Sequence, residues 1–224
     1  MSKTLKILIT GAARGIGMAT AQVLANRGHS VVATDVSALS GLEGIQAHVL
    51  DVTSDDSVAR CLEEVGPLDA IVNNAAIFGG GPVEAYPLDR IRQMFETNTR
   101  GPFLVSQAAY PHLLKSQGRI INIGSLGGLH PWATHGHYCT SKAALHMLTQ
   151  TMAKAFAPEI SVNCVAPGMI VNGEVDPAYE HFAQKTPMQR NGTTTDVAEA
   201  VLFFARGPHF ITGQILGVDG GLGL

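Results

Sequence analysis

The chain has 224 residues, of which 46% are hydrophobic and 15% charged, and it contains 25 glycines. This composition is typical of a parallel sheet buried between helices, and it excludes a disordered chain. The formal charge is −3 and no basic stripe is interleaved with aromatic residues, so we do not expect nucleic acid as a partner.

Short β-branched or aliphatic runs alternate with longer stretches of helical spacing, a pattern that indicates βαβ units and a parallel sheet. In chain order the pattern predicts a strand at 5–10, a helix at 16–26, strands at 29–35 and 47–51, a helix capped by Ser54, a strand at 68–74, a helix at 88–115, a strand at 119–125, a helix at 137–157, a strand at 161–167, a helix at 193–207 and a strand at 214–221. We therefore predict one α/β domain over residues 1–224.

The chain offers no sign of a membrane span, because no apolar run approaches the necessary length. The apolar start at 5–10 is interrupted by Lys6 and is too short for the hydrophobic region of a signal peptide. The three cysteines, Cys61, Cys139 and Cys164, lie far apart and form neither a metal-binding spacing nor a disulfide framework. We expect a soluble, cytoplasmic protein without a metal site or membrane contact.

Three glycines stand where the first predicted strand runs into the first helix, in TGAARGIG (10–17). Gly11 permits a sharp turn, Gly15 lets the backbone approach a diphosphate, and Gly17 lets the helix lie close to the sheet. Free N–H groups at the start of the helix would face the phosphates. The spacing differs from the common dinucleotide fingerprint, so on this motif alone a tight turn without a ligand is an equally good interpretation.

A carboxylate at the end of the second strand favours NAD as the cofactor. Asp35 stands where it can accept hydrogen bonds from both hydroxyls of an adenosine ribose. It would repel a 2′-phosphate, so NADP is disfavoured, although Arg14 is a cation that would partly compensate. Without the neighbouring motifs, Asp35 would be interpreted as a solvated residue at a strand end.

A second group of residues predicts proton exchange with an alcohol. Tyr138 and Lys142 are four residues apart on a predicted helix, so their side chains share one face. A phenol is a poor base at neutral pH, but a neighbouring ammonium and a positive nicotinamide ring would stabilise its phenolate. Ser125 follows the fifth strand, at the edge where open α/β sheets bind ligands, and can hydrogen-bond a substrate oxygen.

These motifs, in this order, resemble the short-chain dehydrogenase/reductase family over nearly the whole chain. The match consists of TGAARGIG (10–17), Asp51 with Val52, NNAA (73–76), Asn98, Ser125, YCTSK (138–142), Pro167 with Gly168, and ITGQILGVDGG (211–221). The family's fold would be a Rossmann-like, doubly wound sheet of seven parallel strands, commonly in a homotetramer. Asp35 and Asp51 are closer in sequence than is usual there, so the helix between the second and third strands should be stunted.

The resemblance also implies roles for individual residues. The catalytic set would be Asn98, Ser125, Tyr138 and Lys142, with Asn98 holding a water that links Lys142 to bulk solvent. Asn172 stands where the family often has a threonine that contacts the nicotinamide carboxamide. The cofactor would be bound by Gly11, Arg14, Gly15, Ile16, Gly17, Asp35, Asp51, Val52, Asn74, Ala75, Tyr138, Lys142, Pro167, Gly168, Ile170 and Asn172.

The predicted activity is hydride transfer between NAD(H) and a secondary alcohol or its ketone. We expect the substrate to be walled by the 78–82 loop, Leu126, Trp132, His135 and the 170–187 segment. The last segment carries Glu174 and Asp176 against a lone Lys185, which disfavours strongly anionic substrates such as CoA thioesters. The substrate should therefore be neutral or weakly polar.

Three other interpretations compete with this one. IGSLGG (123–128) is similar to a hydrolase nucleophile elbow, but Ile123 stands where that motif needs glycine. Histidines at 130, 135 and 137 suggest a metal site, yet no acidic or cysteine partner shares their loop, so pocket lining is the better interpretation. A sensor or structural subunit that binds NAD without turnover is the strongest rival, and the complete set of catalytic residues argues against it.

Overall fold

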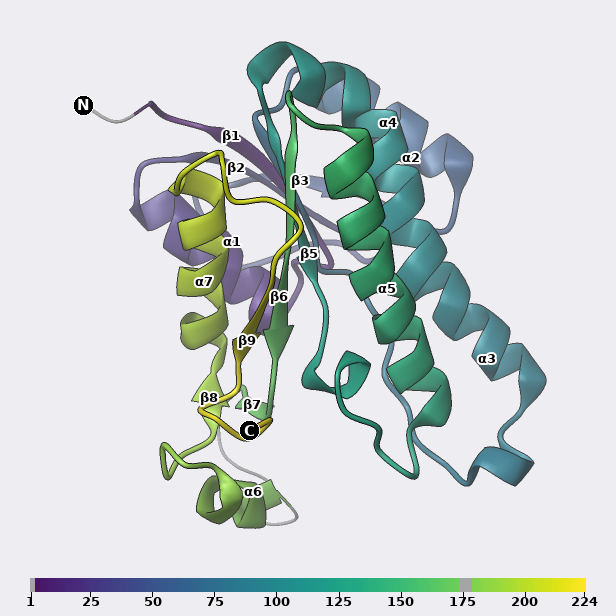
Figure 1. Cartoon of the computed structure of the whole chain (residues 1–224). Helices are drawn as coiled ribbons and strands as arrows, with labels where there is room; N and C mark the ends of the chain where they lie inside the picture. Colours follow the sequence, from purple (N-terminus) through teal and green to yellow (C-terminus); the bar gives the residue numbers. More distant parts are fainter. Residues whose placement is uncertain (1–2, 174–178) are drawn as a thin grey trace.

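Seven parallel strands form one continuous sheet at the centre of the molecule (Figure 1). The computed structural model describes residues 3–173 and 179–224. Across the sheet the strands follow the order β3-β2-β1-β4-β5-β6-β9. Their bounds are β1 Lys6–Thr10, β2 Ser30–Asp35, β3 Gln46–Val49, β4 Ala70–Asn73, β5 Arg119–Ile123, β6 Ser161–Pro167 and β9 Ile215–Val218. The predicted doubly wound sheet is confirmed.

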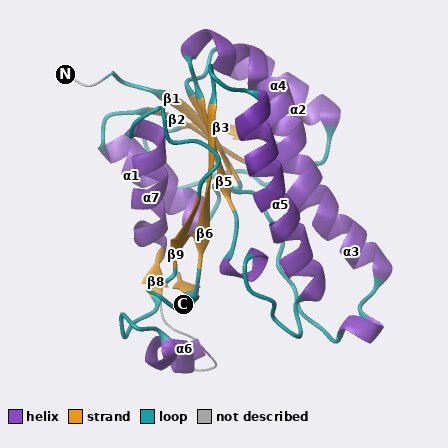
Figure 2. Cartoon of the chain, in the orientation of Figure 1, coloured by secondary structure: helices purple, strands orange, loops and turns teal. Residues whose placement is uncertain are grey.

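Helices cover both faces of this sheet (Figure 2). One face carries α1 (Gly15–Asn26) and α7 (Thr194–Arg206), which pack against each other. The other carries α2 (Asp55–Val65), α4 (Gly101–Ser116) and α5 (Gly136–Ala155). Among the described residues, no helix combines the length and the apolar character needed to cross a bilayer.

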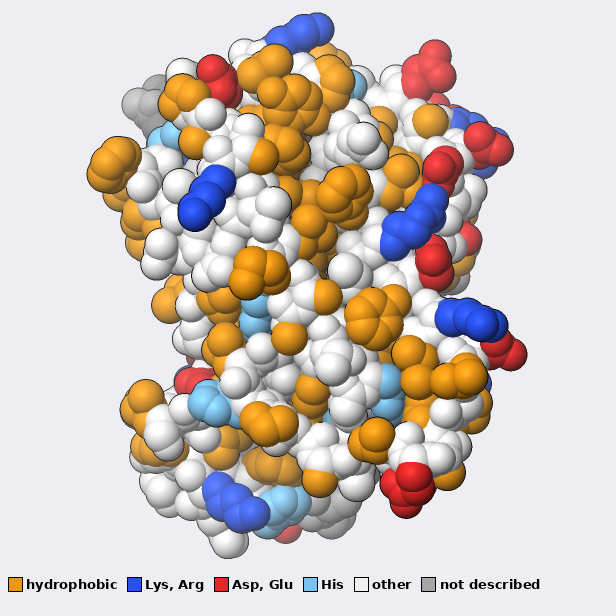
Figure 3. Space-filling view, turned by 45° about the vertical axis from the view of Figure 1, so that its right-hand side comes forward, with side chains coloured by type: hydrophobic (Ala, Val, Ile, Leu, Met, Phe, Trp, Pro, Cys, Tyr) orange, Lys and Arg blue, Asp and Glu red, His pale blue; other side chains and the backbone are white. Residues whose placement is uncertain are grey.

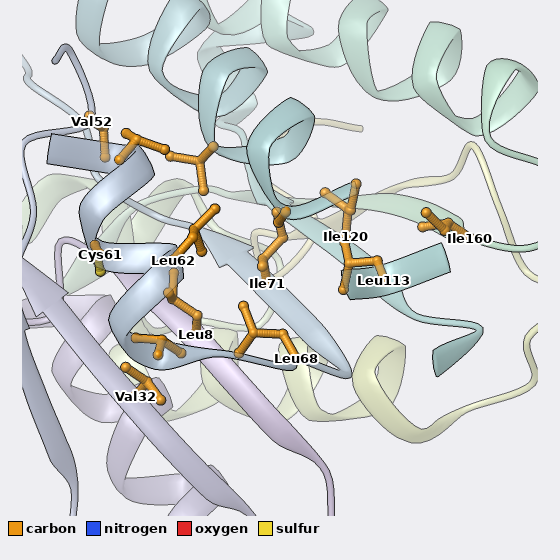
Figure 4. Packing of buried hydrophobic residues seen from close by; sticks show 14 of the residues in the cluster. Leu8, Val32, Val52, Cys61, Leu62, Leu68, Ile71, Leu113, Ile120 and Ile160 are labelled. Atoms are coloured by element: carbon orange, nitrogen blue, oxygen red, sulfur yellow. The ribbon is translucent and has the colours of Figure 1, made fainter. Parts of the chain in front are cut away.

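The two helix layers bury separate hydrophobic clusters because successive residues of a strand point to opposite faces of the sheet. In β1, Leu8 joins the cluster beneath α2 and α4, whereas Ile7 and Ile9 join the cluster beneath α1 and α7. All three are fully buried. Figure 4 shows the first cluster, in which Leu8, Leu62, Ile71 and other apolar side chains meet between sheet and helices.

The strand order places the candidate site. The chain leaves β1 toward β2 and β3 on one side, and from β4 it builds the sheet toward β5 and β6 on the other. The carboxyl ends of β1 and β4 therefore flank the point where the winding direction reverses. In open α/β sheets, ligands bind in the crevice at this position.

The predicted helix over 88–115 is interrupted in the structure. It consists of α3 (Leu88–Phe95), a π-helical segment at Glu96–Arg100 and α4. A π segment keeps the same residue types as an α-helix, so periodicity does not reveal it. Residues 36–45 form no helix, as expected from the short spacing between Asp35 and Asp51.

Several short elements were not predicted from the sequence. They are the 3₁₀ helices η1 (Val83–Ala85) and η3 (Leu126–Gly128), the helix α6 (Glu180–Lys185), and the strands β7 (Ile170–Val171) and β8 (Gly192–Thr193), which pair with each other. One of them, β8, overlaps the predicted helix at 193–207 by one residue.

Candidate active site

The glycine turn after β1 has the geometry of a phosphate cradle. Gly11 and Gly15 have positive φ values of 67° and 58°, a conformation that favours glycine. A Cβ on Gly17 would lie 2.3 Å from the Gly11 carbonyl oxygen, so only glycine permits this close packing of α1 on the sheet. A Cβ on Gly15 would meet nothing within 4 Å, because the backbone there faces open space.

Asn74 and Ala75, after β4, hold this turn in place. The Asn74 side-chain amide donates to the carbonyl oxygens of Thr10 at 3.0 Å and Gly11 at 2.8 Å. The backbone N–H groups of Asn74 and Ala75 both donate to the Thr10 hydroxyl, at 3.1 and 3.0 Å. Asn74 thus ties the carboxyl end of β4 to the carboxyl end of β1, where the winding direction of the sheet reverses. Thr10 was not among the predicted site residues, because its partners lie more than sixty positions away in the chain.

Asp35 ends β2 beside the same turn. Its carboxylate accepts the N–H of Ala13 at 3.1 Å through Oδ2 and the hydroxyl of Ser37 at 3.0 Å through Oδ1. These bonds orient the carboxylate next to the glycine turn while Asp35 itself stays partly exposed. Arg14 directly precedes α1 and makes no side-chain capping bond.

Asp51 and Val52 lie beyond the end of β3. The Asp51 carboxylate accepts the N–H and hydroxyl of Thr53 at 2.9 and 2.7 Å. Val52 is 6% exposed, and its side chain packs so closely on Gly101 that a Cβ there would lie 2.9 Å from it. Its side chain therefore belongs to the core.

Another group of predicted cofactor residues, Pro167, Gly168, Ile170 and Asn172, begins at the last residue of β6 and continues past it. Gly168 packs against Asp219 so closely that a Cβ would lie 2.6 Å from the Asp219 side chain. Ile170 lies in β7 opposite Gly192 of β8, and Asn172 is exposed at the edge of the described residues. The predicted acidic residues Glu174 and Asp176 lie outside the residues that the structure describes.

The arrangement of these residues fits a dinucleotide. The backbone is open at Gly15, the helix start presents free N–H groups, and a fixed carboxylate stands at the neighbouring strand end. No group of three or more potential metal ligands occurs within the described part of the chain, including the loop that holds the histidines.

On the other side of the crevice, α5 presents Tyr138 and Lys142 on one face. Lys142 is 2% exposed, and its Nζ donates to the Ile123 carbonyl oxygen at 2.8 Å. The same Nζ lies 5.9 Å from the centre of the Tyr138 ring. Desolvation by burial lowers the pKa of Lys142 to about 8.

Burial of the phenol has the largest effect on the pKa of Tyr138. Desolvation raises the pKa of Tyr138, while a hydrogen bond with Ser125 acts in the opposite direction. Lys142 is not among the groups that shift this pKa, so the lowering that the sequence led us to expect from it is not seen. A positive ring bound beside the phenol would add a further lowering influence.

Ser125 follows β5 and caps the short helix η3. Its hydroxyl oxygen accepts the Gly127 N–H at 3.0 Å, and the residue is 4% exposed. The bond to Gly127 orients the hydroxyl, while its proton stays available to a second partner. The structure therefore brings Ser125 together with Tyr138 and Lys142, which lie further along the chain on α5.

Asn98 lies in the π-helical segment and is fully buried. Its Oδ1 accepts the Ile77 N–H at 2.9 Å, and its Nδ2 donates to the Ile77 carbonyl oxygen at 2.9 Å and to the Ser141 hydroxyl at 3.1 Å. Ser141 lies next to Lys142 on α5. Asn98 thus fastens the loop after β4 to the helix that carries Tyr138 and Lys142.

Aromatic rings in mutual contact form a wall around the phenol. Phe78 meets Tyr138 edge-on at 4.8 Å and stacks on His135 at 5.0 Å. Trp132 stacks on Tyr138 at 6.1 Å and meets His135 edge-on at 5.7 Å. Burial and the neighbouring His137 lower the pKa of His135, so this wall is uncharged near neutral pH. The sequence predicted these residues as pocket lining or acid/base, but it did not predict their mutual contact.

The chain is similar to known oxidoreductases over nearly its whole length. Residues 11–223 match the family model described as enoyl-(acyl carrier protein) reductase. The chain is 34% identical to the 3-oxoacyl-[acyl-carrier-protein] reductase FabG of Thermotoga maritima, covering 96% of both chains. It is 36% identical to the trans-4-hydroxycyclohexanecarboxylate dehydrogenase of Sinomonas cyclohexanicum, over 96% of this chain and 91% of that one.

Solved structures show the same fold. The ligand-free aldohexose dehydrogenase of Thermoplasma acidophilum superposes with a TM-score of 0.92 at 30% identity, covering 98% of this chain and 94% of that one. A gluconate 5-dehydrogenase of Burkholderia cenocepacia, in complex with NADP and tartrate, gives 0.90 at 31% identity, covering 99% and 96%. The fold and these similarities define an oxidoreductase of a family that uses nicotinamide cofactors. The chain belongs to the short-chain dehydrogenase/reductase family.

Proposed function

We propose that this protein interconverts a secondary alcohol and its ketone with NAD(H) as the cofactor and Tyr138 as the acid/base. The observation that supports this proposal is that Tyr138, Lys142 and Ser125 lie together at the carboxyl edge of the sheet, the same edge that carries the glycine turn after β1. The bound nicotinamide would supply the acceptor or donor of hydride. The side chains of the protein would transfer the proton and hold the substrate in position.

In the direction of alcohol oxidation, Tyr138 Oη takes the proton from the substrate hydroxyl. The Ser125 hydroxyl holds the substrate oxygen while its own oxygen stays anchored to the Gly127 N–H. Lys142 stabilises the phenolate through its charge. Asn98 is proposed to position a water between Lys142 and bulk solvent, which would carry the proton away. The reduction of a ketone uses the same steps in reverse.

The preference for NAD is proposed from Asp35. Its carboxylate is held beside the cofactor turn by the Ala13 N–H and by Ser37. There it would accept hydrogen bonds from a ribose and repel a 2′-phosphate. One structural neighbour is described with NADP, so membership of the family does not by itself fix the cofactor. We attribute the choice in this chain to Asp35.

The proposed substrate is a small, neutral or weakly polar alcohol. The wall beside the phenol consists of Phe78, Trp132 and the uncharged His135, which offer apolar faces and no cation. Relatives named as dehydrogenases of a hydroxycyclohexanecarboxylate, an aldohexose and gluconate fit the reaction type.

A second candidate is reduction of a 3-oxoacyl group carried on acyl carrier protein. The similarity to reductases named for this substrate, at 34% identity over 96% of the chain, favours it. Initial rates with acetoacetyl-CoA and with neutral alcohols and ketones distinguish the two. Activity confined to the thioester would reject our substrate proposal and leave the assignment of Tyr138 intact.

The test of the central proposal is the variant Tyr138→Phe. It removes only the hydroxyl, so folding and cofactor binding should persist while turnover falls by about 10³-fold or more. The measurement is the change in absorbance of NADH with a panel of secondary alcohols, alongside the dissociation constant for NADH by fluorescence. Undiminished turnover would reject Tyr138 as the acid/base. If the wild type bound NAD but turned over none of the substrates, the protein would instead be interpreted as a sensor or structural subunit that binds NAD without catalysis.

We also propose a cytoplasmic homo-oligomer, a tetramer by family resemblance. Apolar side chains on α4 and α5 reach the surface, among them Phe103 at 47% and Met147 at 63% exposure. Together with Phe95, Leu148 and neighbours, they line a shallow hollow on one side of the molecule. Figure 3 shows hydrophobic side chains gathered across the face that carries these helices. A second copy of the chain is the proposed occupant.

A further inference from the structure

A buried histidine lies directly beneath the Ser125 turn. His146 is placed on α5 one turn after Lys142, so Tyr138, Lys142 and His146 follow one another on the same face of the helix. The residue is 4% exposed, and its Nε2 accepts the backbone N–H of Ser125 at 3.4 Å, a long hydrogen bond. The reaction described above gives this imidazole no part.

The backbone of the turn is shaped around the imidazole ring. A Cβ on Gly124 would lie 2.2 Å from Nε2 of His146, and a Cβ on Gly128 would lie 2.6 Å from Cε1. The turn therefore touches the ring both before and after Ser125, and only glycine at both positions allows this approach. With the ring wedged there, Ser125 has little freedom to move away from Tyr138.

The ring is held in its neutral form. Desolvation and the nearby charge of Lys142 lower the pKa of His146 to about 4, against an opposing effect of the Gly128 backbone. The thiol of Cys164 is a further ionisable group beside the same glycine, since a Cβ on Gly124 would lie 2.7 Å from its sulfur. Burial raises the pKa of Cys164 to about 12, so it carries no charge. A neutral ring whose Nε2 accepts must carry its proton on Nδ1.

We propose that His146 is a positioning residue, which holds the Ser125 turn so that the serine hydroxyl faces Tyr138 and the substrate oxygen. This inference rests on the proposed function, because it assumes that Ser125 contacts substrate. The imidazole acts through Ser125 and does not itself touch the reacting atoms. A glutamine side chain at this position would be able to place an amide oxygen where Nε2 lies, whereas an apolar side chain of similar volume would not.

The experiment compares His146→Met and His146→Gln with a matched control, His29→Met. His29 is 7% exposed and its Nδ1 likewise accepts a backbone N–H, from Leu5 at 3.2 Å, at the opposite end of the sheet. Rates are measured with NAD and cyclohexanol, 2-butanol and 1-phenylethanol. We expect His146→Met to lower kcat about tenfold with little change in KM for NAD, and His146→Gln to restore most of it.

A double variant separates positioning from general destabilisation. If His146 acts through Ser125, adding His146→Met to Ser125→Ala should lower kcat no further than Ser125→Ala alone. Hydrogen exchange of the 124–128 backbone, measured on the protein without substrate, should be about tenfold faster in His146→Met and unchanged in His29→Met.

Two results would overturn the inference: additive losses in the double variant, or wild-type kcat and exchange in His146→Met. If His146→Met fails to fold, a loss of kcat in His146→Gln as large as that in Ser125→Ala would overturn it as well. These outcomes leave the proposed function standing. Continued turnover by Tyr138→Phe would instead reject the proposed function, while the exchange measurement would still report on the turn.

Discussion

At the scale of the residue, the fold places an ionisable amine in its core. The amine of Lys142 is almost fully enclosed, and its pKa falls from 10.5 to about 8. Below pH 8 the amine is charged in both the folded and the unfolded chain, so the full cost of burying the charge acts against folding. Between about pH 8 and 10.5 the unfolded chain binds more protons, so this cost diminishes as the pH rises.

Lys142→Met should therefore abolish activity and yet stabilise the fold. At pH 7 we expect a gain of about 1–3 kcal/mol in the free energy of unfolding, because a similar volume is kept without the buried charge. The gain should shrink as the pH rises from 8 toward 10.5. Urea unfolding of both proteins at several pH values measures it, and a variant less stable than the wild type at pH 7 would contradict the prediction.

The cofactor preference also belongs to a single residue. Asp35→Asn keeps an oxygen acceptor for the Ala13 N–H and removes the negative charge. We expect the ratio of kcat/KM for NAD to that for NADP to fall about tenfold or more. Arg14→Ala, the companion variant, should lower kcat/KM for NADP more than for NAD. A wild-type enzyme that is more efficient with NADP would show that Arg14 outweighs Asp35.

At the scale of the element, α7 depends on a compact polar start. The Thr193 hydroxyl accepts the Asp196 N–H, the Asp196 carboxylate accepts the Thr193 N–H, and Arg190 binds the same carboxylate through two nitrogens. These bonds hold the pKa of Asp196 well below its usual range. Thr193 also belongs to β8, which pairs with β7 next to the predicted cofactor residue Ile170.

Asp196→Asn should lower the free energy of unfolding by about 1 kcal/mol at pH 7, a value that allows for the partial exposure of the pair. Because the folded pKa is depressed, the wild type's advantage is present above about pH 4 and is lost as the pH falls further. Denaturant unfolding at pH 7 and pH 3 tests both statements. If the difference in the free energy of unfolding between wild type and variant grew toward acid pH, the prediction would be contradicted.

Most elements could be predicted from local pattern, and the exceptions share a cause. The predicted strand over 161–167 coincides with β6, and the helices at 16–26 and 137–157 agree within two residues with α1 and α5. The π segment at Glu96–Arg100 was missed because it is stabilised by distant partners, such as Ile77 and Ser141 for Asn98. The two-residue strands β7 and β8 are too short to show the alternation of apolar and polar residues by which a strand is recognised.

At the scale of the whole molecule, the exposed apolar face on α4 and α5 predicts association. Met147→Glu would place a charge in the proposed interface and should shift the protein toward the monomer. Val49→Glu, an exposed apolar residue on the edge strand β3, is the matched control and should leave the assembly unchanged. Light scattering coupled to size-exclusion chromatography measures both. A wild-type monomer at micromolar concentration would reject the proposed interface.

The sequence by itself determined the layered α/β fold, the glycine turn, and the shared face of Tyr138 and Lys142. Each of these follows from residue patterns in contiguous stretches of the chain, where strands and helices repeat with a known period. Tertiary structure alone decided that Thr10 meets Asn74, that Asn98 fastens Ile77 to α5, and that His146 lies under Ser125. Such contacts join segments far apart in the chain, and only the packing of helices on the sheet brings them within hydrogen-bond distance.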